Sequence, residues 1–156
     1  MLKRLMPRNR LRGVGHWRRR ILAVQPVVCG PVSRVRVSPT VGLANTLINT
    51  FGGFVDIGDY VFFGHDVMLL TGTHDFRKTG PGRQLACQAM DRGIVIETGA
   101  WIASRAVIIG PCRIGRNAVI GCGCIVDFNV PADTVVRVRQ DVTKDPIRYL
   151  SPRSEA

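Results

Sequence analysis

The chain has 156 residues, of which 46% are hydrophobic, and a formal net charge of +11. Its length predicts one domain with a buried core. No apolar run approaches the roughly 20 residues of a membrane-spanning helix, because Gln25 and Pro26 interrupt the longest early run. The five cysteines show no metal-site spacing, so we expect reduced thiols in a cytoplasmic protein.

Residues 1–31 are predicted to form a basic N-terminal arm. Residues 1–20 carry eight basic and no acidic side chains, giving +8, whereas the remaining 14 basic and 11 acidic residues give +3. A solvated tail is one interpretation. Apolar residues such as Leu5 and Trp17 alternate with the charges, which favours an anionic membrane surface over nucleic acid as a partner of residues 1–20. A peripheral position at the inner face of the membrane is a hypothesis that rests on this charge.

The first half of the remaining chain shows a six-residue hydrophobic period. Two registers carry it, Val35-Val41-Leu47 and Ile57-Phe63-Leu69. The second register is the stronger, because Gly58 and Gly64 follow its first two members. A six-residue period does not fit an α-helix and instead indicates short β segments separated by turns.

The second half repeats the same period without a break. The aliphatic positions are Ile96, Ile102, Ile108, Ile114, Ile120 and Val126. The residues four positions later are small or of modest size: Ala100, Ala106, Cys112, Ala118, Cys124 and Val130. One such unit has no means of burying its aliphatic side chain, so neighbouring units must stack.

An insertion separates the two halves. Leu69 and Ile96 are 27 positions apart, which is not a multiple of six, and residues 72–93 are predicted to form a long loop. Loops of this length within compact domains are usually functional. The loop contains His74, one of only three histidines in the chain. We therefore regard His74 as a candidate functional residue.

The repeat over residues 32–138 resembles that of the hexapeptide-repeat acyltransferases. Within that family, "GTHDF" at residues 72–76 and "AWIAS" at residues 100–104 are most similar to the galactoside and maltose O-acetyltransferase branch. The resemblance implies an all-β fold, a left-handed parallel β-helix in which three hexads form one triangular coil, with a C-terminal tail over residues 139–156. The spacing alone does not show the handedness, which runs against the usual right-handed crossover.

The resemblance also implies an activity and a catalytic residue. It predicts transfer of an acetyl group from acetyl-CoA to a hydroxyl of a sugar or saccharide, with His74 as the general base. An imidazole is suited to removing a proton from a hydroxyl near neutral pH. Because a thioester is already activated, the reaction needs neither a covalent intermediate nor a metal.

The acceptor is expected to meet Asn49, Asp75 and Arg83. The family places an acceptor-binding asparagine one coil before the loop, and of Asn45 and Asn49 we favour Asn49. The alternative for both is a turn residue or an internal asparagine ladder. Asp75 either orients the imidazole or caps the loop. For Arg83 a solvated charge remains the alternative.

The donor groove is expected to include Trp101, Ser104, Cys122 and Asp127. Two departures from the family pattern weaken this assignment. "DFN" at residues 127–129 replaces a motif with a lysine, and "VRVRQD" replaces the segment that normally follows. Arg137 and Arg139 are therefore expected to supply the contacts to phosphate.

The family forms homotrimers, and we expect the same here. Two other functions share the fold. A γ-type carbonic anhydrase needs three histidine ligands for zinc, whereas here His65 and His74 are nine residues apart and His16 lies in the arm. A catalytically inactive β-helix scaffold is the other alternative, favoured by the altered C-terminal motif.

Overall fold

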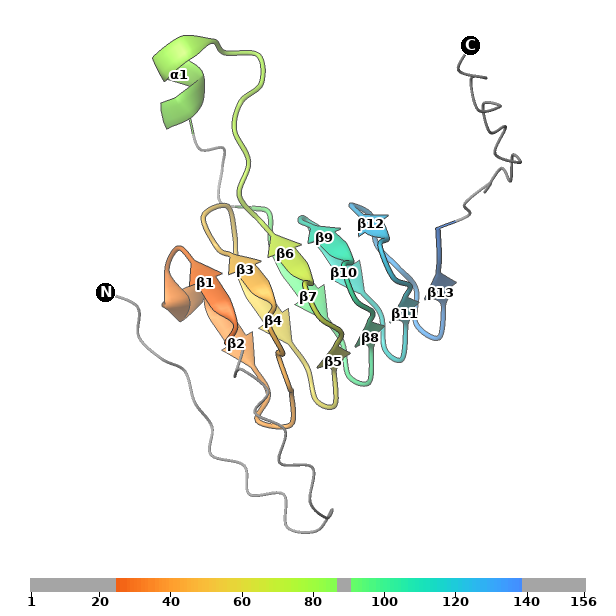
Figure 1. The fold of residues 1–156 in the computed structure, drawn as a ribbon. Helices are drawn as coiled ribbons and strands as arrows, with labels where there is room; N and C mark the ends of the chain where they lie inside the picture. The colour runs from red at the N-terminus through yellow and green to blue at the C-terminus, as the bar shows by residue number, and fades with distance from the viewer. Residues whose placement is uncertain (1–24, 87–90, 139–156) are drawn as a thin grey trace, which may run out of the picture.

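The structure is a computed structural model that describes residues 25–86 and 91–138. These residues form a stack of coils with three parallel sheets and one projecting loop (Figure 1). Sheet A contains β1 (Val27–Cys29), β3 (Leu47–Asn49), β6 (Met68–Leu70), β9 (Val107–Ile109) and β12 (Ile125–Val126). Sheet B contains β2 (Val35–Val37), β4 (Val55–Ile57), β7 (Ile94–Ile96) and β10 (Cys112–Ile114). Sheet C contains β5 (Phe62–Phe63), β8 (Trp101–Ile102), β11 (Val119–Ile120) and β13 (Val135–Val136).

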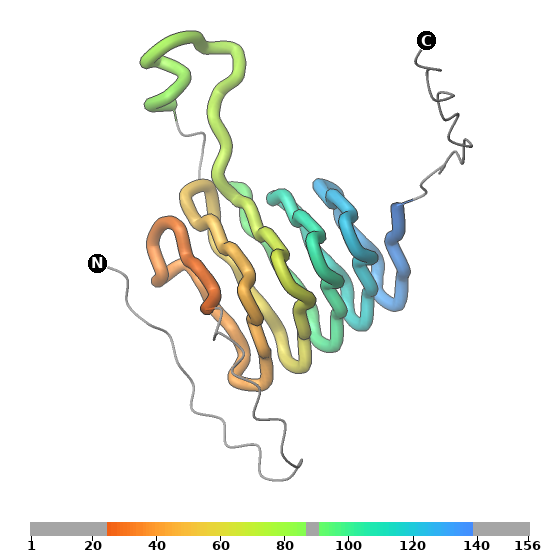
Figure 2. Tube along the Cα trace, in the orientation of Figure 1, coloured from red at the N-terminus to blue at the C-terminus, as the bar shows by residue number. Residues whose placement is uncertain are grey.

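The chain visits the three sheets in turn, and each coil adds one rung to the stack (Figure 2). All strand pairs are parallel, and successive coils align in register, as in Leu69 against Ile108 and Ile57 against Ile96. Each strand has only two or three residues, because the chain must turn at every corner of the prism. The predicted β-stack is therefore confirmed.

The core is a column of side chains that point into the prism. The six aliphatic positions from Ile96 to Val126 are at most 1% exposed, and the small residues four positions later are buried beside them. Cys112 and Cys124 belong to that inner set. Burial of each aliphatic side chain contributes about 1.5–3 kcal/mol, so the repeated period is the main source of stability.

The corners place several non-glycine residues in the left-handed backbone region. Tyr60, Asp66, Arg105, Asn117 and Asp133 have φ between 54° and 61°. Each lies two residues before the next strand, and Gly99 and Gly123 occupy the equivalent place in their coils. This conformation costs roughly 1–2 kcal/mol for an L-residue, so the stacking on both sides must hold it.

The structure corrects two predictions for the first coils: the inward residue of β3 and the residue at which the stack begins. The weak register predicted Leu47 as an inward residue, but Leu47 is half-buried and Ile48 is the fully buried partner of Leu69. The turn before it is one residue longer and contains Ala44 at φ 48°. The stack also begins before the expected boundary at residue 32, because β1 pairs with β3. Residues 1–24 of the arm and the tail over residues 139–156 lie outside the described residues.

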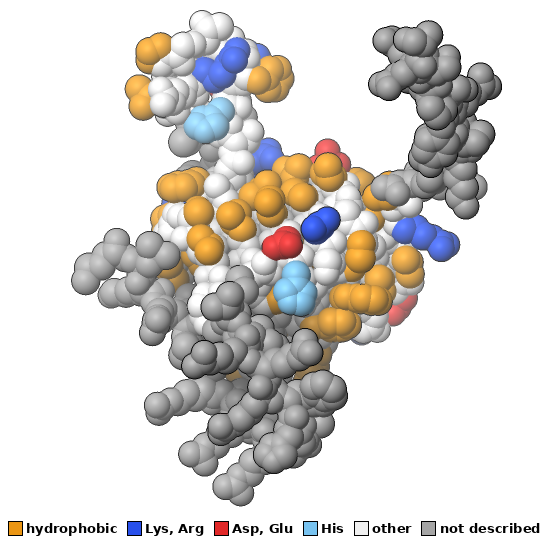
Figure 3. Space-filling model, in the orientation of Figure 1, with side chains coloured by type: hydrophobic (Ala, Val, Ile, Leu, Met, Phe, Trp, Pro, Cys, Tyr) orange, Lys and Arg blue, Asp and Glu red, His pale blue; other side chains and the backbone are white. Residues whose placement is uncertain are grey.

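The outer faces of the three sheets differ in polarity. Sheet A carries an aliphatic ladder of Val27, Leu47, Met68, Val107 and Ile125. Sheet C carries Phe62, Trp101, Val119 and Val135. Sheet B instead carries Arg36, Asp56, Val95 and Arg113. Figure 3 shows hydrophobic side chains gathered on one side of the stack and on the projecting loop.

Among the described residues, no helix has the length and hydrophobicity needed to span a bilayer.

Candidate functional site

The projecting loop leaves the prism after β6 and returns at β7, at the corner between sheets A and B. One coil later, residues 110–111 alone make the same connection between β9 and β10. The base of the loop is tightly packed, since a Cβ on Gly52 would lie 2.1 Å from the carbonyl oxygen of Thr71. Arg92 closes the base by donating from Nε to that same oxygen at 3.0 Å. The loop therefore begins and ends at fixed points.

The orientation of His74 is set by a backbone carbonyl within the loop. Its Nδ1 lies 3.2 Å from the carbonyl oxygen of Arg83, and the side chain is otherwise exposed. A carbonyl oxygen can only accept, so Nδ1 carries the hydrogen in this contact. In the neutral ring Nε2 then keeps a free lone pair, which is the state that a general base requires.

Asp75 does not contact the imidazole. Its carboxylate accepts from Arg77 Nε at 2.9 Å, from Arg77 Nη2 at 3.2 Å and from the Arg77 backbone N–H at 3.1 Å. The hydrogen bond from the Arg77 side chain is the main reason why the pKa of this carboxyl is lowered. Of the two roles expected for Asp75, the structure shows the turn-capping one.

The Arg83 guanidinium is directed into the loop. It donates from Nη2 to the carbonyl oxygen of Phe76 at 3.0 Å and from Nε to that of Lys78. These contacts differ from the substrate contact expected from the sequence. Arg83 lies in α1 (Gly80–Leu85), a short helix with no buried residue, so hydrogen bonds are the main constraint on the shape of this segment.

Asn49 lies beside His74 in a recess at the base of the loop. The recess is lined by Asn49, Phe51, Gly52, Leu70, Gly72, Thr73 and His74. The side-chain oxygen of Asn49 accepts from the backbone N–H groups of Phe51 at 3.1 Å and Gly72 at 3.0 Å. Its Nδ2 group has no partner among the described residues. Asn45 is instead hydrogen-bonded to Asp66, so it does not belong to this recess.

Ser104 and Cys122 lie together at another corner, between sheets C and A. They line a second recess with Arg105, Gly123 and Val138. The hydroxyl oxygen of Ser104 accepts from the backbone N–H of His65 at 3.1 Å. Trp101 precedes this corner in β8, where its half-exposed ring stacks on Phe62 with centroids 5.6 Å apart.

Three further residues are expected in the donor groove, and none of them is seen to line the recess of Ser104 and Cys122. Asp127 follows β12, at the corner between sheets A and B, and it does not line the recess of Ser104 and Cys122. Residues one hexad apart lie at successive corners of the prism. The motif alone does not show at which corner Asp127 lies. Arg137 follows β13 and directly precedes Val138 of the recess, whereas Arg139 lies outside the described residues.

The two recesses flank opposite ends of the strands of sheet A. The recess of His74 follows β3 and β6, whereas the recess of Ser104 and Cys122 precedes β9 and β12. A three-residue strand spans about 10 Å, and the loop projects away from the stack (Figure 1). His74 and the Ser104 recess therefore do not form one cavity within a single chain.

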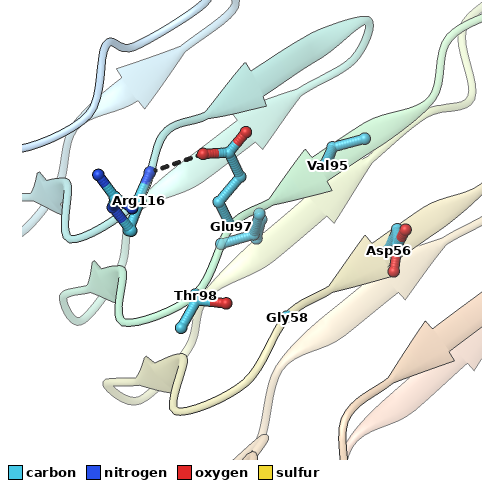
Figure 4. A pocket seen from close by; sticks show the side chains of 7 residues that line it. Asp56, Gly58, Val95, Glu97, Thr98 and Arg116 are labelled. Atoms are coloured by element: carbon cyan, nitrogen blue, oxygen red, sulfur yellow. Dashed lines mark hydrogen bonds between the residues drawn. The ribbon is translucent and has the colours of Figure 1, made fainter.

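A third hollow, on sheet B, does not resemble a catalytic site. The residues that line it are Asp56, Gly58, Val95, Ile96, Glu97, Thr98 and Arg116 (Figure 4). Glu97 accepts from the Arg113 side chain and from the Arg116 backbone N–H at 2.9 Å. The hydrogen bond from Arg113 is the main reason why its pKa is lowered. This carboxylate is already paired, and the hollow belongs to the ionic face of the prism.

Two known proteins that are similar to this chain in sequence share only part of its length. No family model matches it. The galactoside O-acetyltransferase of Lactococcus lactis is 31% identical over 83 residues, which cover 51% of this chain and 37% of that protein. The bifunctional protein GlmU of Methylococcus capsulatus is 44% identical over 48 residues, 30% of this chain and 10% of that protein. This chain therefore spans only a minor part of each relative.

A solved structure extends the comparison to the fold. The hexapeptide-repeat acetyltransferase of Vibrio cholerae, in complex with acetyl coenzyme A, is 26% identical and has a TM-score of 0.52. The match covers 70% of this chain and 58% of that chain. The chain therefore resembles the hexapeptide-repeat acetyltransferases in sequence and in fold. The expected fold, a left-handed parallel β-helix, is thereby confirmed.

Within this hexapeptide-repeat protein, sequence reasoning missed two residues that line the recesses. Phe51 lies beside Asn49 and is 52% exposed. Arg105 lines the recess of Ser104 and Cys122. The available signal for Arg105 was its corner position, six residues after Gly99, because corner side chains in this fold point outward. Among the described residues, no group of three or more His, Cys, Asp or Glu side chains is arranged to hold a metal.

Proposed function

We propose that the protein transfers the acetyl group of acetyl-CoA to a hydroxyl of a saccharide acceptor, with His74 as the general base. The hydrogen bond from His74 Nδ1 to the carbonyl of Arg83 is the observation that carries the proposal. It leaves Nε2 free to accept a proton. The names of the relatives and the acetyl coenzyme A complex of the Vibrio cholerae protein support the reaction class.

The proposed reaction needs no group beyond the base. Nε2 of His74 removes the proton from the acceptor hydroxyl as the oxygen attacks the thioester carbonyl. The tetrahedral intermediate then collapses, the carbon–sulfur bond breaks, and the imidazolium returns the proton to the leaving thiolate. The products are an acetyl ester and free CoA. Removal of such a base typically lowers the rate about 10²–10⁴-fold.

The acceptor is proposed to bind in the recess around Asn49 and His74. The Nδ2 group of Asn49, which has no partner among the described residues, is positioned to donate to an acceptor hydroxyl. The half-exposed ring of Phe51 offers an apolar surface for a sugar face. The side chains that line this recess carry no carboxylate and no permanent cation. That composition favours a neutral saccharide over a sugar acid.

The donor is proposed to lie along the corner of Ser104 and Cys122. Arg105 and Arg137 are the cations nearest that recess in the sequence, and phosphate groups of CoA are their natural partners. Trp101 would border the groove. Asp127 is not part of this proposal, because it lies at another corner.

We propose that the active unit is a homotrimer. The recesses of His74 and Cys122 are separate in one chain, so a second copy must bring a loop to the donor groove. Sheets A and C both present apolar outer faces, whereas sheet B presents paired charges. Two different apolar faces on each chain permit a head-to-tail contact, which closes into a ring when the rotation allows it.

The test is CoA release from acetyl-CoA in the presence of a panel of neutral oligosaccharides and sugar nucleotides. We expect acceptor-dependent release by the wild-type protein and a loss of about 10²-fold or more in His74→Gln. Calorimetric titration with acetyl-CoA supplies the control, since the variant should still bind the donor. Equal, acceptor-independent release by both proteins would favour an inactive scaffold.

A second proposal concerns residues 1–20, which lie outside the described residues. Their +8 charge suits an anionic membrane surface. Partitioning of the full chain onto liposomes that contain an anionic phospholipid should fall when residues 1–20 are deleted. Unchanged partitioning would remove the proposal.

A further inference from the structure

Arg83 contacts both the imidazole of His74 and the turn that precedes α1. Its backbone carbonyl accepts from His74 Nδ1 at 3.2 Å. Its guanidinium donates to the carbonyl of Lys78 and, at 3.0 Å, to that of Phe76. The same residue therefore binds the imidazole through its backbone and the preceding turn through its side chain.

The loop has little else to determine its shape. Phe76 and Leu85 are 80% and 81% exposed, and α1 contains no buried residue. Without an apolar core, a segment of this length depends on hydrogen bonds to hold one conformation. Asp75 closes the turn over residues 75–78 through Arg77, and the backbone N–H of Asp75 reaches Ala86 at 3.3 Å. Arg83 is the side chain that ties this turn to α1.

Loss of the Arg83 side chain would affect His74 indirectly. Two donors to the turn would disappear, and the carbonyl of Arg83 would no longer be held opposite Nδ1. A neutral histidine ring in water prefers the tautomer with the hydrogen on Nε2 and the basic lone pair on Nδ1. In that tautomer Nε2 has no lone pair with which to accept a proton.

We propose that Arg83 is a positioning residue that holds His74 in the tautomer with hydrogen on Nδ1. This inference rests on the proposed function only for its kinetic consequence, because the tautomer itself is a property of the folded chain. It also replaces the expected substrate contact of Arg83 with a role inside the loop.

The decisive variant is Arg83→Met, which keeps an unbranched side chain but removes both donors. Lys78→Met is the matched control, because it removes one positive charge from the same loop. Lys78 contributes only its backbone carbonyl and N–H to the hydrogen bonds described. Arg83→Lys restores the charge and one donor group, and should rescue part of the effect.

The first readout is the ¹⁵N NMR spectrum of the histidine rings, recorded at about pH 8.5, where an ordinary imidazole is neutral. The chain has three histidines, so a His74→Gln spectrum assigns the ring. We expect a protonated Nδ1 and an unprotonated Nε2 in the wild-type protein and in Lys78→Met. In Arg83→Met the proton should shift toward Nε2. An unchanged tautomer in Arg83→Met would overturn the proposal.

The second readout is kinetic and separates positioning from donor binding. We expect kcat in Arg83→Met to fall about tenfold to a hundredfold, as for a misplaced catalytic group, while the KM for acetyl-CoA changes little. Lys78→Met should retain its kcat. If kcat falls equally in both variants, loop charge rather than positioning is responsible and the proposal fails. A shifted tautomer in a protein without transferase activity would uphold Arg83 and overturn the proposed function instead.

Discussion

The side-chain oxygen of Asn49 lies 3.0 Å from the backbone nitrogen of Gly72 and accepts its hydrogen bond. This contact joins the second coil of the prism to the first residues of the projecting loop. The same oxygen accepts from Phe51 at 3.1 Å. A side chain on a strand of the prism therefore fixes the start of a loop whose described residues form no hydrophobic core, and His74 follows two residues later.

Gly72→Ala should disrupt this junction. A Cβ at that position would lie 2.6 Å from the Asn49 oxygen, closer than real contacts allow. We expect kcat/KM to fall about tenfold to a hundredfold through displacement of His74, with only a small change in Tm. Gly82→Ala is the control in the same loop, because a Cβ there meets nothing within 4 Å. Equal activity of the two variants would contradict this account of the junction.

The stacked aliphatic column should dominate stability. Ile108 is 0% exposed at the centre of the stack, so Ile108→Ala should lower the free energy of unfolding by about 2–5 kcal/mol. Val32 lies in the turn before β2, outside the apolar faces of sheets A and C, and is 40% exposed, so Val32→Ala should have a clearly smaller effect. Urea unfolding of the two variants measures the difference. Similar losses would mean that the column is not the main stabilising feature.

The thiols of the described residues should differ strongly in reactivity. Burial, followed by the charge of Asp127, raises the pKa of Cys112 to about 11, so this thiol stays protonated and inert. Cys122 is exposed beside Ser104. We expect a maleimide to label Cys122 near neutral pH and to leave Cys112 and Cys124 unmodified in the folded protein, as peptide mass mapping would show.

The same experiment tests the donor groove. Acetyl-CoA bound along the corner of Ser104 and Cys122 should slow the labelling of Cys122. Labelling at Cys29, which lies in β1 and outside that recess, should not change. Unaltered labelling of Cys122 at saturating acetyl-CoA would move the donor site elsewhere.

Most of the prism follows from the sequence because its period is short and its core is one side chain wide. Ile96, Ile102 and Ile108 could be assigned as inward residues from spacing alone, and the structure confirms them. Leu47 could not, because a turn one residue longer moves every later side chain in that strand to the opposite face. The buried residue is Ile48.

The site was less predictable than the fold. The family resemblance points to His74 and Asn49, and the structure brings both to one recess, but their roles stay predictions. The partners of Asp75 and Arg83 do not, because polar side chains in a loop select among many nearby carbonyls and donors at similar free energy. The family motif predicts Asp127 in the donor groove, whereas the residue follows β12 at a different corner of the prism.

The central claim is that His74 of one copy acts at the donor groove of another, and subunit complementation tests it most directly. His74→Gln removes the base, and Cys122→Trp fills the groove while leaving His74 intact. Each variant alone should be inactive. Co-expressed copies that assemble at random should regain activity at about one interface in four. Mixed assemblies that form but remain as inactive as the two single variants would contradict an active site shared between subunits.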